Sequence, residues 1–176
     1  MSDATVATMP VAAPVEAEKP RKLSMVVMSG DMDKLFGAFI IATGAAAMGN
    51  EVTMFFTFWG LRALKRADAR MTGKTMFGRM LGMMYGGGIE KANPSKFSFG
   101  GMGRWMFGKM MKSNNVSSLP DLRDLAIDLG VKMYGCQMSM DVMEIPQESF
   151  VKGVMDPVGV GFFIGEAQES QVTLFI

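Results

Sequence analysis

The sequence predicts an α/β fold in which a five-stranded, mainly parallel sheet carries helices on both faces. Two observations lead to this prediction. Short apolar runs with strand character alternate with longer segments of helical character along most of the 176 residues. The apolar runs are nearly continuous, which is typical of parallel strands that are buried on both faces. The chain is long enough to form a single domain with a substantial core.

The first strand and the first helix are predicted from the start of this domain. The run KLSMVVMS (22–29) is apolar and is followed by a Gly-Asp pair, so we expect a buried strand. The next segment, DMDKLFGAFIIATGAAAMGN (31–50), begins with acidic residues and ends with Gly-Asn. These are typical signals for the two ends of a helix.

A second strand and a second helix follow directly. The run EVTMFFTF (51–58) is rich in β-branched and aromatic residues, which favour strands. The next segment, WGLRALKRA (59–67), is expected to begin another helix. This order of strand, helix, strand and helix is typical of a parallel sheet with helices on both faces.

The second half of the chain contains the clearest helix. It is predicted at 118–130, with a serine as its cap, a proline in its first turn and a glycine as its stop signal. Its apolar residues have helical spacing and are Leu122, Leu125, Ala126 and Leu129. The remaining predicted elements are a strand (131–136), a short helix that ends near Ile145, a weaker strand (149–155), a helix (156–170) and a closing strand (171–176).

Residues 1–21 are predicted to form a disordered tail, and residues 22–176 a single domain. Three prolines and an acidic start are unlike the basic start and unbroken apolar stretch of a signal peptide. The longest run of low polarity, from Leu35 to Gly49, has 15 residues, whereas a bilayer span needs roughly 20. We therefore expect a cytoplasmic protein, and peripheral membrane contact stays open.

One segment, residues 62–117, interrupts the alternation of strands and helices and is predicted to be a basic Met/Gly-rich insertion. Its part from Arg62 to Lys112 holds 11 of the 18 Lys and Arg residues and only two acidic residues, so it carries a charge of +9. Methionines recur at helical spacing in two places, which predicts two short amphipathic helices. They are Met76, Met80 and Met83 in the first helix, and Met102, Met106 and Met110 in the second.

Two roles fit the composition of this insertion. Methionine is common on surfaces that adapt to partners, so residues 70–112 could dock on an acidic protein or make peripheral contact with an anionic membrane. The same methionines could instead pack on their own domain or on a neighbouring subunit of a homo-oligomer. The sequence leaves both roles open.

The composition excludes several classes of function. The formal charge of +1 predicts no general attraction to nucleic acid. One cysteine and no histidine exclude an internal disulfide, a four-ligand Cys/His zinc site and catalytic arrangements of the Ser-His-Asp or Cys-His kind. We predict neither a metal nor a cofactor.

The candidate site is predicted at one edge of the sheet. Ligands of open parallel sheets bind beyond the carboxyl ends of the strands, near the point where the strand order reverses. This rule selects the loops after the first three predicted strands, with Cys136 as the reactive residue. The residues expected to shape a pocket around it are Ser29, Gly30, Asp31, Trp59, Gly135 and Gln137.

Two roles remain open for Cys136. Its sulfur would face the N-terminus of the helix that follows, where free N–H groups and the helix dipole stabilise a thiolate. Such a thiolate could attack a sulfane sulfur without a general base, hold it as a persulfide and pass it to another thiol. A cysteine buried among apolar neighbours would instead be an inert packing residue.

Several stretches resemble the DsrE/DsrF-like family, and in particular its DsrE-type subfamily with a long insertion. They are KLSMVVMSGDMDKLFGAFIIATGAAAMGNEVTMFFTFWGLRALKR, the Met/Gly-rich insertion, VKMYGCQMSMDVMEI and SQVTLFI. The resemblance covers residues 22–176. It implies a flavodoxin- or Rossmann-like DsrE fold, assembly into homo-oligomers and a sulfur-relay role. The family cysteine that accepts persulfide sulfur corresponds to Cys136.

The resemblance also implies partners, namely small TusA-like sulfur carriers and rhodanese-like sulfurtransferases. Some relatives have a second cysteine nearer the N-terminus, which this chain lacks. We therefore expect a cytoplasmic sulfur-relay protein, which is sulfurtransferase-like if it is an enzyme. The alternative is a non-enzymatic oligomeric or membrane-surface docking module with an inert buried cysteine.

Overall fold

The computed structural model describes residues 20–69 and 73–176. Residues 1–19 of the predicted tail and residues 70–72 of the predicted insertion lie outside the described residues. The first strand begins at Lys22, where the sequence predicts the domain to start.

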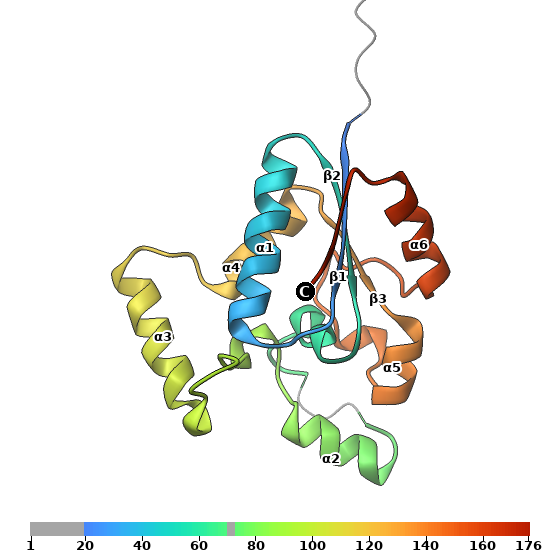
Figure 1. Ribbon diagram of the computed structural model, residues 1–176. Helices are drawn as coiled ribbons and strands as arrows, with labels where there is room; N and C mark the ends of the chain where they lie inside the picture. The colour runs from blue at the N-terminus through green and yellow to red at the C-terminus, as the bar shows by residue number, and fades with distance from the viewer. Residues whose placement is uncertain (1–19, 70–72) are drawn as a thin grey trace, which may run out of the picture.

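Within the described residues, four parallel strands form one sheet in the order β3-β2-β1-β4 (Figure 1). The central strands β1 and β2 pair along their whole length, from Lys22 opposite Glu51 to Val27 opposite Phe56. Both are largely buried, as their continuous apolar sequences predict. The strands are β1 (Lys22–Val27), β2 (Glu51–Phe56), β3 (Lys132–Gly135) and β4 (Val172–Phe175).

The predicted fifth strand at 149–155 is wrong, because this segment runs irregularly beside β3. One backbone hydrogen bond joins it to that strand, from Met155 N–H to Met133 O at 2.9 Å, whereas Val151 N–H donates to Leu64 O at 2.9 Å. Gly153 has a φ of 92°, a left-handed conformation that interrupts an extended run. Pro157 has no N–H to continue a ladder of hydrogen bonds.

Helices cover both faces of the sheet, as predicted (Figure 1). On one face α1 packs against α4 and the sheet, and the rings of Phe39 and Phe56 have centroids 6.2 Å apart. On the other face α6 packs over the central strands, where Phe163 stacks on Phe55 at 5.4 Å. These helices are α1 (Met32–Ala47), α4 (Leu119–Asp128) and α6 (Val160–Glu169).

The helix predicted at 118–130 is present as α4, but its buried stripe lies three residues earlier than predicted. Ser118 and Asp121 form reciprocal capping bonds at its start. Leu125 and Leu129 of the predicted stripe are 45% and 41% exposed. The buried residues keep the same helical spacing and are Leu119, Leu122, Arg123 and Ala126.

The helix predicted to begin at Trp59 is a 3₁₀ turn rather than an α-helix, η1 (Phe58–Leu64). Gly60 approaches β1 so closely that an added Cβ would lie 2.1 Å from a backbone oxygen of that strand. The turn ends at Lys65, where the backbone becomes extended. Along this path the side chains of Arg62 and Lys65 are buried.

Both amphipathic helices predicted in the insertion are present. Figure 1 shows α2 beside the carboxyl end of the sheet and α3 projecting away from the body of the protein. Many of their apolar side chains are exposed rather than packed on the domain: Met76, Phe77, Met80, Met83, Met102, Trp105, Met106, Phe107 and Met110. The helices and turns of this segment are α2 (Met76–Met84), η2 (Ile89–Lys91), η3 (Phe99–Gly101) and α3 (Met102–Ser113). None of the helices in the described ranges has both the length and the apolar character needed to cross a membrane.

Candidate functional site

The loops after β1 and β2 form a pocket of about 370 Å³ at the carboxyl end of the sheet. Four of the predicted pocket residues line it: Ser29, Gly30, Asp31 and Trp59. Leu81 and Tyr85, which were not predicted from the sequence, complete the lining. The first of the predicted loops is held by its own hydrogen bond, from Asp31 N–H to the Ser29 hydroxyl at 3.1 Å.

Tyr85 forms one wall of this pocket and ties the end of α2 to η1. Its hydroxyl donates to the backbone oxygen of Trp59 at 3.2 Å, and the two ring centroids are 4.9 Å apart. The guanidinium carbon of Arg62 lies 3.6 Å from the centre of the Tyr85 ring, in a cation–π contact. Burial raises the pKa of Tyr85, so the phenol stays protonated and remains a donor.

Gly30→Ala is expected to push Tyr85 out of this wall. An added Cβ would lie 1.9 Å from the Tyr85 hydroxyl oxygen and 2.5 Å from the backbone oxygen of Trp59. Overpacking costs about 1–3 kcal/mol, so the free energy of unfolding should fall by that amount. Amide hydrogen exchange should become faster in residues 76–85. Gly44→Ala in α1 is the control, because nothing lies within 4 Å of its added Cβ. Equal stability and exchange in the two variants would contradict this pocket geometry.

Cys136 does not line the pocket. It lies between β3 and α5 (Gln137–Met143), and only 5% of its surface is exposed. It packs in a small cluster with Phe55 and Phe163, on the face of the sheet that α6 covers. The thiol is therefore a covered group in this structure, next to the strand end where the sequence places it.

The strand order and the alternation of side chains explain this separation. β3 is an edge strand, whereas the pocket lies beyond β1 and β2. Side chains alternate along a strand, so Cys136 continues the face of Tyr134, and Gly135 faces the other side. Gly135 is buried, whereas Gln137 is exposed and donates its side-chain amide to Asp141 at 2.8 Å.

The start of α5 retains two backbone N–H groups that no acceptor among the described residues satisfies. Gln137 donates its N–H to Val158 O at 3.1 Å, whereas Met138 and Ser139 make no such bond. These two residues hold the positions to which the side chain of an N-cap residue reaches. Cys136 is that N-cap residue and forms no side-chain capping bond. The start of α5 thus has two free donors, which the Cys136 side chain does not contact in this structure.

The helix that covers Cys136 is held by few buried side chains. Phe163 is the one buried residue of α6, whereas Val160 and Phe162 are 63% and 40% exposed. Phe162 packs against Tyr134 with ring centroids 4.7 Å apart. The cover over the thiol therefore depends mainly on one phenylalanine.

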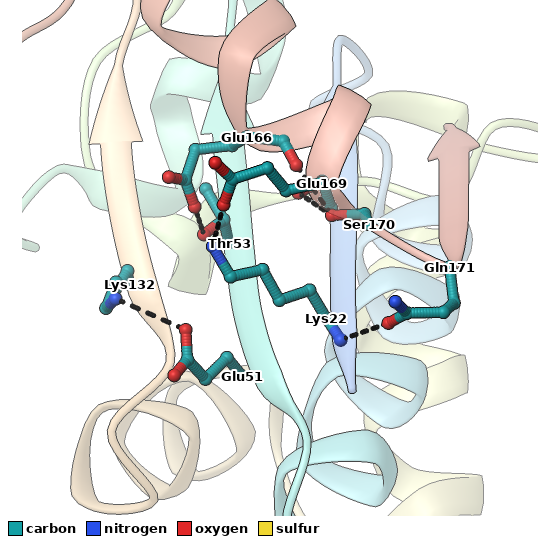
Figure 2. A network of polar contacts seen from close by, with 9 residues as sticks. Lys22, Glu51, Thr53, Lys132, Glu166, Glu169, Ser170 and Gln171 are labelled. Atoms are coloured by element: carbon teal, nitrogen blue, oxygen red, sulfur yellow. Dashed lines mark hydrogen bonds and ion pairs between the residues drawn. The ribbon is translucent and has the colours of Figure 1, made fainter. Parts of the chain in front are cut away.

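A polar network holds the C-terminal end of α6 (Figure 2). Lys22 of β1 forms an ion pair with Glu169, and the Thr53 hydroxyl of β2 donates to Glu166 at 3.0 Å. The chain just before the other end of α6 pairs with Cys136. The network thus fixes the end of α6 that is remote from the thiol. At the near end, backbone hydrogen bonds of Val158 with Gly135 and Gln137 hold the chain just before the helix, and apolar packing holds the helix itself.

Glu144 links α5 to the start of α2. It follows α5 in a left-handed conformation, with a φ of 50°. Its carboxylate accepts hydrogen bonds from the N–H of Thr75 at 2.8 Å, from the Thr75 hydroxyl at 2.5 Å and from the N–H of Lys74. Thr75 is the N-cap of α2, so these bonds fix where α2 begins. The bonds from Thr75 hold the pKa of Glu144 below its usual 4.5.

Glu144→Gln is expected to loosen α2. The amide keeps the size of the side chain but loses the charge that strengthens its bonds to Thr75. Amide hydrogen exchange should become faster in residues 74–84 and change little in the sheet. Helix α2 of the wild-type protein should loosen in the same way in acid. The pKa of Glu144 is lowered in the folded state, so its stabilisation is present above pH 4.5 and is lost as the pH falls through the lowered pKa. Glu148→Gln, at an exposed site, is the control. Unchanged exchange in Glu144→Gln would rule out this link.

The described residues thus present two separate features at the carboxyl end of the sheet. One is an open pocket beyond β1 and β2, and the other is a covered thiol beyond β3. No group of three or more His, Cys, Asp or Glu side chains in the described ranges could hold a metal ion. The chemistry at hand is that of a thiol, which can act as a nucleophile and form mixed disulfides or a persulfide.

Comparison with known proteins identifies the family. A model of the DsrE/DsrF/DrsH-like family matches residues 19–175, nearly the whole chain. The chain belongs to this family. The resemblance found in the sequence is thereby confirmed, whereas the description of residues 62–117 as an insertion stays a prediction.

Two bacterial proteins have clear sequence similarity to this chain. "Uncharacterized protein YrkE" of Bacillus subtilis is 39% identical over 159 residues, which cover 90% of this chain and 99% of the relative. "Sulfur carrier protein DsrE2" of Allochromatium vinosum is 36% identical over 160 residues, which cover 89% of this chain and 98% of the relative.

A solved structure supports the same fold. The ychN protein from E. coli superposes with a TM-score of 0.56 at 10% sequence identity, covering 89% of this chain and 99% of that protein. At this identity the similarity shows a shared fold. The predicted α/β class with a parallel sheet is therefore confirmed, and the predicted number of strands is not.

Proposed function

We propose that this protein is a sulfur-relay protein, which accepts sulfane sulfur as a persulfide on Cys136 and passes it to another protein. The observation that carries this proposal is the position of its sole cysteine, at the start of α5, in a chain 36% identical to a protein named as a sulfur carrier. A relay of this kind fits a chain without histidine, because an ionised thiolate needs no general base.

The loading step can be written with thiosulfate as the donor. The thiolate of Cys136 attacks the outer sulfur of thiosulfate, the S–S bond of thiosulfate breaks, and sulfite leaves with the bonding electron pair. The product is a persulfide on Cys136, and the step needs no external oxidant or reductant. The free N–H groups of Met138 and Ser139 would stabilise the negative charge on the sulfur. The partner's thiolate then attacks the outer sulfur of the persulfide in the same way.

Relay also requires access to Cys136, which is 5% exposed in this structure. We propose that α6 opens at its N-terminal end, where Phe163 is the buried anchor. The polar network of Figure 2 would then hold the other end of the helix as a pivot. Local openings of this kind are common where few apolar contacts hold an element in place.

The proposed partners are a TusA-like sulfur carrier and a rhodanese-like sulfurtransferase. The proposed compartment is the cytoplasm, where reducing conditions keep a lone cysteine as a thiol. Exposed methionines of α2 and α3, together with the positive charge of residues 70–112, would dock an acidic partner surface.

For a homo-oligomer, α6 and the edge strand β4 offer exposed apolar residues: Val160, Phe162, Ile164, Val172 and Phe175.

The test is transfer of sulfur to a partner. The protein is loaded with thiosulfate or polysulfide, freed of excess reagent and mixed with a TusA-like carrier, whose mass is then measured. The carrier should gain one sulfur atom from wild type and none from Cys136→Ser. A carrier that gains nothing from wild type, or as much from Cys136→Ser, would overturn the proposed relay.

A second candidate function is a docking module, which one observation favours. Cys136 is covered, while apolar side chains of the basic helices α2 and α3 are exposed. The thiol would then be an inert packing residue, and residues 70–112 would make peripheral contact with an anionic membrane. Wild type should sediment with anionic vesicles, and a variant without residues 70–112 should not. A protein that relays sulfur and stays in the supernatant would exclude this candidate.

A further inference from the structure

A second pocket, of about 490 Å³, lies between α3 and the body of the protein. Its lining comes mainly from α3, from η2 and from the first turn of α4, none of which lines the pocket beyond β1 and β2. The volume is within the range of small-molecule sites, roughly 300–1,000 Å³. The pocket is therefore large enough for a small organic molecule.

Most of the residues that line this pocket are apolar. Ile89, Ala92 and Leu119 belong to the buried core of the protein, and Met111 lines the pocket from α3. Gly108 of α3 also lines it, and nothing lies within 4 Å of an added Cβ at this position. Apolar surface of this kind favours a hydrocarbon group, because both surfaces leave water on contact.

Two cations of α3 line the same pocket, Arg104 and Lys112. The ion pairs within the described ranges involve other lysines and arginines. Arg104 donates to the backbone oxygen of Lys91 at 3.1 Å, and its remaining N–H groups have no acceptor in the described part of the chain. Guanidinium and ammonium groups form strong hydrogen bonds with carboxylates. The two side chains can therefore hold an anionic head group.

Two carboxylates also line the pocket, but they do not reverse this preference. Asp121 accepts hydrogen bonds from the N–H of Ser118 at 3.1 Å and from its hydroxyl at 2.6 Å, in the cap of α4. Glu90 is exposed, and it is one of only two acidic residues in the segment from Arg62 to Lys112, whose charge is +9. The positive charge of this segment favours an anionic head group over a cationic one.

We propose that this pocket binds a free fatty acid of medium chain length, such as decanoate. Its carboxylate pairs with Arg104 and Lys112, and its alkyl chain lies on the apolar lining beside Gly108. Binding there does not depend on sulfur relay by Cys136, because no residue of β3 or α5 lines the pocket. Because α3 supplies the cations and the body of the protein supplies the buried apolar residues, a bound fatty acid would also hold α3 on the domain.

Calorimetric titration with three ligands tests the chemistry of this site. Decanoate has the head and the tail, acetate has the head alone, and decylamine has the same tail with a positive charge. Below its micellar concentration, decanoate should bind saturably with one molecule per chain, whereas acetate and decylamine should give no measurable binding. Equal binding of decylamine and decanoate, or no binding of decanoate, would overturn the proposal.

Filling the pocket tests its position. Gly108→Leu places a side chain in the pocket and replaces a glycine inside a helix, so α3 should stay folded while decanoate binds at least about tenfold more weakly. Gly165→Leu in α6 is the control, because nothing lies within 4 Å of its added Cβ either. Lys112→Met should weaken binding about two- to fivefold, whereas Lys109→Met, outside the pocket, should not.

Native mass spectrometry shows what occupies the pocket. Each wild-type chain should carry one decanoate, and Gly108→Leu should carry none. Unchanged binding in Gly108→Leu would place the ligand elsewhere and overturn the proposal. A wild-type oligomer that Gly108→Leu converts to monomers would show that another copy of the chain fills the pocket, and this result would overturn it as well.

Discussion

Phe163→Ala is expected to raise the rate at which a small alkylating reagent labels Cys136 by about 100-fold. Phe163 is the one buried residue of α6, it stacks on Phe55, and it shares a cluster with the cysteine. Loss of a buried phenylalanine costs about 3–5 kcal/mol. A free-energy change of about 1.4 kcal/mol changes an equilibrium constant tenfold. The 100-fold faster labelling therefore requires that only part of this loss favours the open position of α6.

Two controls separate opening of α6 from a general loss of stability. Phe39→Ala removes a fully buried ring from α1, on the opposite face of the sheet. At a similar loss of stability, Cys136 should be labelled more slowly in this variant than in Phe163→Ala. Ile164→Ala changes a half-exposed residue of α6, and Cys136 in this variant should be labelled as fast as in wild type. Mass spectrometry measures labelling, and urea unfolding measures stability. If Phe39→Ala labels as fast as Phe163→Ala, the thiol reacts only from the unfolded chain, and the proposed opening is wrong.

Lys65→Met is expected to increase the free energy of unfolding near neutral pH by about 1 kcal/mol. Methionine has nearly the length of lysine, and it carries no charge to desolvate. The pKa of Lys65 is lowered in the folded state from its usual 10.5, so the unfolded chain binds more protons. Wild-type stability therefore rises as the pH approaches 10.5, and the advantage of the variant shrinks over the same range.

Urea unfolding at several pH values between neutrality and 10.5 measures this effect. Lys96→Met is the matched control, because it removes the same charge from an exposed position and should change stability by less than about 0.5 kcal/mol. A Lys65→Met protein that is less stable than wild type at every pH would show that the buried ammonium has a stabilising partner. The desolvation penalty assigned to Lys65 would then be wrong.

The central strands could be predicted from the sequence because burial on both faces requires continuous apolar residues. The segment at 149–155 is also partly apolar, but Gly153 takes a left-handed conformation that no hydrophobic pattern reveals. The stripe of α4 has the predicted spacing, yet its position depends on how the helix packs against α1, which is a tertiary contact. Local patterns therefore predicted the elements better than their packing.

The candidate site was predictable to a similar extent. Ser29 and Trp59 could be placed together because both follow neighbouring parallel strands. Tyr85 and Lys65 could not, because their positions depend on how α2 and η2 pack against η1. The alternation of side chains after β3 could have placed Cys136 on the face of Tyr134. Only the structure shows that α6 covers that face.

Whether Cys136 carries the relayed sulfur is tested most directly by the mass of the tryptic peptide 133–152, which contains it. The whole protein is incubated with polysulfide, freed of excess reagent and digested. We predict a wild-type peptide that is heavier by one sulfur atom and loses this atom on reduction, and no added sulfur in Cys136→Ser. A wild-type peptide of unchanged mass, or an equal gain of sulfur by Cys136→Ser, would contradict the proposed relay.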